Sequence, residues 1–262
     1  MHHPLLSRSV VLIPLLLASA HGAFVSTTAG PVLVDDFNDN DLSNFTSTVI
    51  LNNATGFNVG FSATDGKVSA SSTDATPEQV LFLQSSVGLD VGQTIILNTA
   101  LTPTSSGLVD DFGLAIASTA TPTGLSGGAT GDTRTGGTYS FLFVAARSSS
   151  NEIRSAGSNG TTNFATDVDG TIPEDSILGL FIKRTTSTTY DLGYINATNV
   201  FVPTISRTVA DTNLGTAIGF YGDLRGATLT VGGWDNLVLI PEPSAALLGA
   251  CGMLAILRRR RA

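Results

Sequence analysis

Short apolar segments alternate along the central part of the chain with clusters of Gly, Asn, Asp, Ser and Thr, and this pattern restricts it to all-β folds. Between the two ends of the chain, no window repeats its apolar residues with the 3.6-residue period of a helix. Segments rich in β-branched and aromatic residues predict strands: 32–37, 48–51, 57–61, 80–83, 94–101, 112–117, 139–145, 177–182, 188–195, 217–221, 228–231 and 234–240.

The predicted strands are of two kinds, which favours an antiparallel β-sandwich. Residues 141–144 and 178–182 are apolar throughout, as in inner strands that are covered on both faces, whereas Tyr190, Leu192 and Tyr194 alternate with other residues. A Thr-rich stretch at 185–189 predicts a hairpin turn. The longest loop is expected at 118–138, where large apolar residues are scarce, and we expect it to be mobile.

The N-terminus has the features of a cleavable export signal. Arg8 and two histidines give a mildly basic start, residues 10–17 are apolar apart from one proline, and Ala-Ser-Ala at 18–20 is a cleavage site of the A-x-A type. We therefore expect residues 1–23 to be a signal peptide that forms a helix before cleavage, and residues 24–239 to be one exported domain.

The C-terminal segment 240–262 has the features of a membrane anchor. Its apolar run, 245–257, is 13 residues long. As a helix this run would reach about 20 Å, against a hydrocarbon core of roughly 30 Å, so it is a short membrane helix. The arginines that follow form a stop-transfer block expected on the cytoplasmic side: Arg258, Arg259, Arg260 and Arg261.

The order of motifs in this tail resembles the PEP-CTERM sorting signal of Gram-negative bacteria. The motif itself is Pro241, Glu242 and Pro243, and the apolar run and the arginines follow it. The resemblance implies recognition, and cleavage near the motif, by an exosortase, a membrane protease-transpeptidase. It also implies transient anchoring in the inner membrane, then a place at the cell surface or in the extracellular matrix together with extracellular polysaccharide.

Charge and residue usage exclude several classes of function. The chain has a formal net charge of −8 although five of its arginines lie in the two terminal segments, so the exported part is more acidic still. Nucleic acid is therefore not an expected partner. The only cysteine, Cys251, lies in the tail, and the histidines lie at or before residue 21, which excludes a disulfide, zinc and histidine-assisted nucleophiles in the domain.

Several strings resemble those of concanavalin A-like jelly rolls. They are DDFND near the start with GGWDNLVL at the end, VDDFGLAIA followed by YSFLFVAAR, and the series ILGLFIKR, TTYDLGYI and AIGFYGD. This family includes lectins, laminin-G-like modules and laminarinase-type glycoside hydrolases. The resemblance implies two curved antiparallel sheets over nearly the whole exported domain, with the first and last strands paired.

A glycosidase site is not apparent from the sequence. Retaining glycosidases need two carboxyl groups about 5–5.5 Å apart, and the laminarinase-type members place them on one strand as E-x-D-x-E. The exported domain has only Glu78, Glu152 and Glu174, in no such pattern, and Glu152 is the best isolated candidate. We assign no catalytic residue and expect no enzyme, although a pair of aspartates could replace the missing glutamates.

An oxygen-rich cluster near the start of the domain predicts a calcium site. The candidate ligands are Asp36, Asn38, Asp39 and Asp41, because calcium prefers carboxylate and amide oxygens. The alternative is a series of turns in which short side chains cap the local backbone. More distant contributors to a calcium site would be Asp110, Asp111 and Asp235. We expect no other cofactor.

Saccharide binding would require exposed aromatic rings. The candidates are tyrosines on predicted strands, where alternate positions face outward: Tyr139, Tyr190, Tyr194 and Tyr221. Trp234 starts the last strand and is expected in the core. The leading prediction is an exported envelope or matrix β-sandwich with a structural or adhesive role. The alternative is a lectin-like module with an unassigned glycan site, and a glycoside hydrolase is less favoured.

Overall fold

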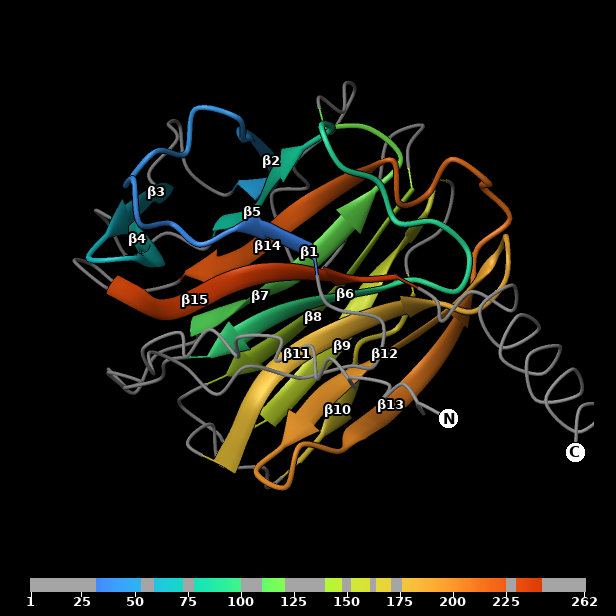
Figure 1. Cartoon of the computed structure of the whole chain (residues 1–262). Helices are drawn as coiled ribbons and strands as arrows, with labels where there is room; N and C mark the ends of the chain where they lie inside the picture. The colour runs from blue at the N-terminus through green and yellow to red at the C-terminus, as the bar shows by residue number, and fades with distance from the viewer. Residues whose placement is uncertain are drawn as a thin grey trace, which may run out of the picture.

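The computed structural model confirms an all-β fold. It describes residues 32–52, 59–72, 78–99, 110–120, 140–147, 152–160, 164–170, 176–224 and 230–241, and these contain fifteen β-strands and no α-helix. All described strand pairs are antiparallel. The strands form two sheets packed face to face, as predicted for a sandwich (Figure 1).

The two sheets have seven-strand paths, and one carries an additional strand. Sheet A runs β13 (Phe201–Thr208), β12 (Thr189–Asn196), β11 (Ile177–Arg184), β6 (Thr94–Thr99), β15 (Thr230–Ile240), β4 (Lys67–Ser72) and β3 (Val59–Thr64), and β1 (Val32–Asp35) also pairs with β15. Sheet B runs β10 (Asp167–Asp169), β9 (Glu152–Asn159), β8 (Ser140–Arg147), β7 (Asp110–Ala117), β14 (Ala217–Leu224), β5 (Glu78–Gln84) and β2 (Thr46–Asn52).

The core between the sheets is rich in aromatic rings. Phe220 of β14 lies near Phe37, Phe45 and Phe112, with ring centroids 5.2–5.9 Å apart. Trp234 of β15 stacks on Phe112 at 5.8 Å and is buried, as the sequence predicts. Aromatic pairs at these separations stabilise the fold by more than the burial of their apolar area alone.

Sheet B is also buried on the face that points away from sheet A. Strands β8 and β14 are buried at every position. Their alternate residues form a second apolar cluster with β5 and β7, which includes Leu81, Leu83, Phe141, Phe143 and Tyr221. The prediction that some strands are covered on both faces is therefore correct for the middle of sheet B.

The predictions from the sequence missed four strands and divided one strand into two. Strands β4, β9, β10 and β13 were not predicted. β4 and β9 are rich in Ser, Ala and Gly, while β10 and β13 lie at sheet edges, where Pro203 of β13 is tolerated. The segments predicted at 228–231 and 234–240 join into β15, which has register shifts at 232–234 and 235–237. Strands of small residues, such as β4 and β9, and the edge strands β10 and β13 lack the long apolar runs on which the predictions depend.

The predicted pairing of the terminal strands is confirmed, as is the hairpin at 185–189. Val32 of β1 lies opposite Leu239 of β15, and the turn between β11 and β12 is closed by hydrogen bonds from the amides of Thr185 and Thr186 to the carbonyl of Thr189. β15 continues to Ile240, which lies opposite Thr94, and Pro241 follows directly.

Other predictions fall outside the described residues. The signal peptide, the tail from residue 242 and most of the 118–138 loop belong to this group, so their assignments and the domain boundaries at 23 and 239 stay predictions. Within the part of the chain that is described, no helix has the length and apolar character needed to cross a membrane.

Candidate functional site

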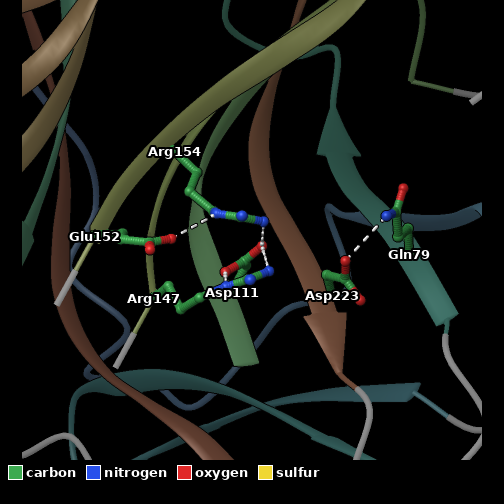
Figure 2. A network of polar contacts seen from close by, with 6 residues as sticks. All are labelled: Gln79, Asp111, Arg147, Glu152, Arg154 and Asp223. Atoms are coloured by element: carbon green, nitrogen blue, oxygen red, sulfur yellow. Dashed lines mark hydrogen bonds and ion pairs between the residues drawn. The ribbon is translucent and has the colours of Figure 1, made fainter. Parts of the chain in front are cut away.

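A row of polar side chains crosses the outer face of sheet B. The pairing register of sheet B places its members opposite one another on five adjacent strands: Gln79 (β5), Asp223 (β14), Asp111 (β7), Arg147 (β8) and Glu152 (β9). Residues that lie opposite each other in antiparallel strands point to the same face. The residues that follow or precede them along these strands, such as Phe112 and Ile153, point into the core. We call these five residues the polar row (Figure 2).

An ion pair lies at the centre of the polar row. Arg147 donates from Nε to Oδ1 of Asp111 at 2.6 Å and from Nη2 to Oδ2 at 2.8 Å, so the contact is bidentate. Arg154 of β9 lies beside this pair, with Nη1 3.9 Å from Oδ2 of Asp111, and its Nε donates to Glu152 at 3.0 Å. Bidentate pairs of this kind fix orientation as well as contributing energy.

Gln79 and Asp223 form the other half of the row. The side-chain amide of Gln79 donates to Oδ2 of Asp223 at 2.9 Å (Figure 2). Both side chains are buried, as is Asp111. At the β9 end, by contrast, the side chains of Arg154 and Glu152 are 22% and 24% exposed. The row therefore extends from the interior of the molecule to solvent.

Burial raises the pKa of Asp111 to about 6. The hydrogen bonds from Arg147 lower this pKa, whereas the negative charge of Asp223 raises it further. Burial also lowers the pKa of Arg147, but the hydrogen bonds and charge of Asp111 outweigh it and the net pKa is raised, so Arg147 stays cationic. A carboxyl group that titrates near pH 6 can hold or release a proton under ordinary conditions.

The aromatic residues on the same face do not form an exposed platform. The ring of Tyr221 stacks on Phe143 with centroids 3.7 Å apart and an interplanar angle of 5°. The strand between theirs has Gly113 opposite Tyr221 and Ala115 opposite Phe143, so no large side chain of that strand keeps the rings apart. Both rings are buried.

Of the other candidate tyrosines, the two that the structure describes, Tyr190 and Tyr194, give no fully exposed ring either. Tyr190 is buried in the core and donates to the carbonyl of Leu214 at 2.7 Å. Tyr194 is half-buried and packs against the core. Tyr139 lies outside the described residues. The prediction of tyrosine stacking platforms is wrong for Tyr190 and Tyr221, because the faces to which they point are covered.

The proposed calcium ligands make the local turns that were the alternative. Oδ1 of Asp36 accepts from the amide of Asn38 at 3.2 Å, Oδ1 of Asp39 accepts from the amide of Asp41 at 2.9 Å, and Asp41 accepts from Ser43. The more distant candidates Asp111 and Asp235 lie on the two different sheets. Among the described residues, no three His, Cys, Asp or Glu side chains converge in a group that could hold a metal ion. Calcium binding stays a prediction.

Sequence reasoning missed the polar row. It named Asp111 only as a distant calcium ligand and Glu152 only as an isolated carboxylate, and it did not name Gln79, Arg147 or Asp223. One signal was present: Asp111, Arg147 and Asp223 each lie near one end of a strand that is mostly apolar. A charge in a strand that is covered on both faces must find a partner on a neighbouring strand.

No family model matches this chain, and no curated protein matches it. Solved structures do. One, described with endo-acting O-glycanases of the human gut microbiota that initiate mucin breakdown, has a TM-score of 0.47 and 10% identity and covers 80% of this chain and 99% of its own. The CBM2 module of the evolved Dit of Lactobacillus casei BL23 phage J-1 has a TM-score of 0.44 and 12% identity over 78% and 92% of the two chains.

The β-glucanase of Bacillus licheniformis has a TM-score of 0.41 and 9% identity over 82% of this chain and 100% of its own. The fold resembles that of the jelly-roll glucanases. At this level of identity the likeness concerns the fold alone. We expected no enzyme, and this expectation is corrected in one respect: glucanases are among the structures that the fold resembles, so the fold does not support it. The likeness gives no evidence of catalysis in this chain.

Proposed function

We propose that the chain is an exported carbohydrate-binding β-sandwich of the cell envelope or extracellular matrix, and that its saccharide site lies at the solvent-exposed end of the polar row. The observation that carries this proposal is the row itself, in which five adjacent strands each contribute one polar side chain to the same face. Its targeting would follow the tail: sorting through Pro241, Glu242 and Pro243 and processing by an exosortase.

The exposed end of the row has the groups that bind a sugar. Arg154 supplies guanidinium donors and Glu152 supplies carboxylate acceptors for hydroxyl groups. Val168 of β10 lies opposite Arg154 in register and is 43% exposed, which provides an apolar surface for the C–H face of a sugar ring. A few converging polar groups beside apolar surface are typical of small-ligand sites.

The buried part of the row would hold this site in position. Arg154 lies between Glu152 and Asp111, and Asp111 is held by two hydrogen bonds from Arg147. A binding group that is already fixed by its neighbours loses less conformational freedom when the ligand arrives. The row has three carboxyl groups against Arg147 and the neighbouring Arg154, so it has no excess of positive charge for a polyanion, which favours a neutral polysaccharide.

The test is binding of the full-length protein, in detergent, to an array of bacterial and plant polysaccharides, followed by calorimetry on each hit. Replacing Arg154 with Ala should weaken binding about tenfold or more, because hydrogen bonds from charged groups contribute roughly 1.5–3 kcal/mol. Lys183→Ala is the matched control, since Lys183 is an exposed cation on the other sheet. Equal affinities of wild type and Arg154→Ala would refute the assignment of this site.

A specific observation also favours a second candidate, a glycoside hydrolase. Asp111 and Asp223 are opposite each other on adjacent strands, and side chains so placed have Cβ atoms about 4.5–5.5 Å apart. Neighbours of this kind can bring their carboxyl groups to the separation of about 5–5.5 Å that a retaining glycosidase uses, and the pKa of Asp111 is raised to about 6. Release of reducing ends from a polysaccharide, lost in Asp223→Asn but retained in Lys183→Ala, would establish this activity.

The sorting part of the proposal has its own test. In a Gram-negative host that contains an exosortase, the wild-type chain should be found first in the inner membrane and then as a shorter species at the surface or in the medium. Replacing Pro241, Glu242 and Pro243 with Ala should leave the longer, membrane-bound species. Immunoblots of cell fractions would show both forms, and unchanged processing of the triple variant would contradict the assignment of the motif.

A further inference from the structure

The last strand of the sandwich passes into the C-terminal tail with almost no linker. β15 remains paired to its end, with Leu239 opposite Val32 and Ile240 opposite Thr94. Only four residues, 241–244, separate Ile240 from the apolar run that begins at Ala245. Even fully extended, four residues span at most about 14 Å. The end of sheet A and the start of the apolar run are therefore close.

Because the apolar run is short, the end of sheet A would also lie close to the surface of a bilayer that the run enters. Its 13 residues reach about 20 Å as a helix, whereas the hydrocarbon core is roughly 30 Å thick. If the terminal arginines stay at the far surface, residues 241–244 must cover much of the remaining distance, unless the bilayer thins. In either case Ile240 would lie near the lipid headgroups.

The end of the sandwich from which the tail leaves carries exposed apolar side chains. We call it the exit end and define it by the exposed Val32, Leu33 and Val91 and by Ile240, the buried last residue of β15. Val32 and Leu33 lie opposite the last residues of β15 and are 52% and 46% exposed. Val91 is 48% exposed and belongs to the turn just before Thr94, the partner of Ile240.

Hydrogen bonds hold the turn that carries Val91 in place. The amide of Gly92 donates to the carbonyl of Arg184 at 2.7 Å, and the amide of Arg184 donates to the carbonyl of Gln93 at 3.0 Å. Nη1 of Arg184 donates to the carbonyl of Leu89 at 3.0 Å. Val91 is therefore presented on a turn that is fixed on both sides, and the exposure of its side chain is a property of the folded end.

We propose that the exit end docks on the outer surface of the lipid bilayer, with Val32, Leu33 and Val91 at the level of the headgroups. This inference rests on the membrane anchoring that the tail implies. The exposed cation Lys183 lies opposite Thr94 at the same end and suits an anionic headgroup. Docking would fix the orientation of the sandwich at the membrane, because the short linker leaves it little rotational freedom.

The test uses the full-length chain in vesicles of phosphatidylcholine with phosphatidylglycerol, with an environment-sensitive fluorophore on a single cysteine. The label at Val91→Cys, in a Cys251→Ser background, should shift its emission to the blue on reconstitution and be quenched by a quencher attached to lipid headgroups. Val200→Cys is the matched control, since Val200 is 52% exposed and follows Asn196, which pairs with Ile177 at the opposite end of β11.

A third labelled protein separates this inference from the anchoring on which it depends. A fluorophore on the native Cys251 reports whether the tail enters the bilayer. If the labels at 251 and 91 both respond and that at 200 does not, docking is supported. If 251 responds while 91 behaves like 200, docking is overturned but anchoring stands. If 251 does not respond, both are overturned.

A spacer variant sharpens the result. Inserting a flexible Gly/Ser segment between Ile240 and Pro241 releases the sandwich from the short linker. Partial loss of the response at Val91, with the Cys251 response unchanged, is the outcome expected if the linker contributes to docking. Replacing Val32, Leu33 and Val91 with Ser in a chain labelled at Thr186→Cys, on the β11–β12 turn of the same end, should reduce the response there. An unchanged response would overturn the role of the apolar side chains.

Discussion

Asp111 and Asp223 lie directly opposite each other on β7 and β14, and each is only 1% exposed. Two buried carboxyl groups on directly opposite positions of neighbouring strands destabilise the fold when both are ionised, because their negative charges repel. The fold compensates on either side: Arg147 forms a bidentate pair with Asp111, and the amide of Gln79 donates to Asp223. The raised pKa of Asp111 reflects the part of the cost that remains, because burial outweighs the hydrogen bonds of Arg147.

Asp111 should make stability depend on pH in a direction opposite to that of ordinary surface carboxylates. Its pKa in the folded protein is about 6, above the unfolded value of 3.8. The folded state therefore binds the proton more tightly, so the contribution of this group is fully present below about pH 4 and is lost as the pH rises to about 6. Asp36 and Asp41, whose pKa values are lowered by hydrogen bonds, act in the opposite direction.

The comparison of wild type with Asp111→Asn isolates this contribution. Urea midpoints measured at steps between pH 4 and pH 7 should give a difference between the two proteins that changes across this window, with wild type losing stability relative to the variant as the pH rises. A difference that is constant between pH 4 and pH 7 would show that Asp111 does not titrate there.

Removing Arg147 alone from the ion pair should lower the unfolding free energy more than removing both Arg147 and Asp111. Arg147→Met leaves Asp111 buried without its bidentate donor, and the expected loss is about 3–5 kcal/mol of unfolding free energy. Asp111→Leu combined with Arg147→Met removes both charges and should recover part of that loss. Denaturant unfolding of the two single variants and the double variant gives the coupling energy. A double variant no more stable than Arg147→Met would contradict this account.

Phe220 is the residue on which the aromatic core depends most. Its ring contacts those of Phe37, Phe45, Phe82 and Phe112, at centroid distances of 5.2–6.3 Å. Phe220→Ala should cost about 3–5 kcal/mol, because the rings around it cannot close the cavity fully. Phe201→Ala is the control, since Phe201 is only half-buried on the outer face of sheet A. Equal losses of stability in the two variants would refute the central position of Phe220.

The sequence predicted the strands that carry apolar runs, because such runs are needed to fill two buried faces. Segments such as 141–144 and 178–182 are found within β8 and β11, and Trp234 is in the core. Strands rich in Ser and other small residues, such as β4 and β9, were missed because little in their composition distinguishes them from loops. Their pairing is determined by neighbouring strands, not by their own residues.

The polar row could not be predicted for a related reason. Its members come from strands whose order in the sheet, β5-β14-β7-β8-β9, differs from their order along the chain. Asp223 is 112 residues from Asp111 in sequence, yet the two are adjacent in register. A sequence orders residues along the chain, whereas this site depends on which strands become neighbours and on the register in which they pair.

Arg184 should prove the main stabiliser of the exit end. Its guanidinium donates to the carbonyls of Leu89, Ser187 and Thr212, which joins three separate loops, and it lies 5.6 Å from the centre of the Tyr190 ring. Arg184→Met should lower the unfolding free energy by about 2 kcal/mol, since hydrogen bonds from charged groups contribute more than neutral ones but two of these three are exposed to solvent.

Two further variants decide whether geometry or charge is responsible for this effect. Arg184→Lys keeps the charge but cannot reach three carbonyls at once, so it should lose nearly as much stability as Arg184→Met. Lys183→Met removes the neighbouring exposed cation and should stay within about 0.5 kcal/mol of wild type. If Arg184→Lys were as stable as wild type in thermal and urea unfolding, the hydrogen bonds to the three loops would not be what stabilises this end, because the conservative variant lacks them and retains only the positive charge.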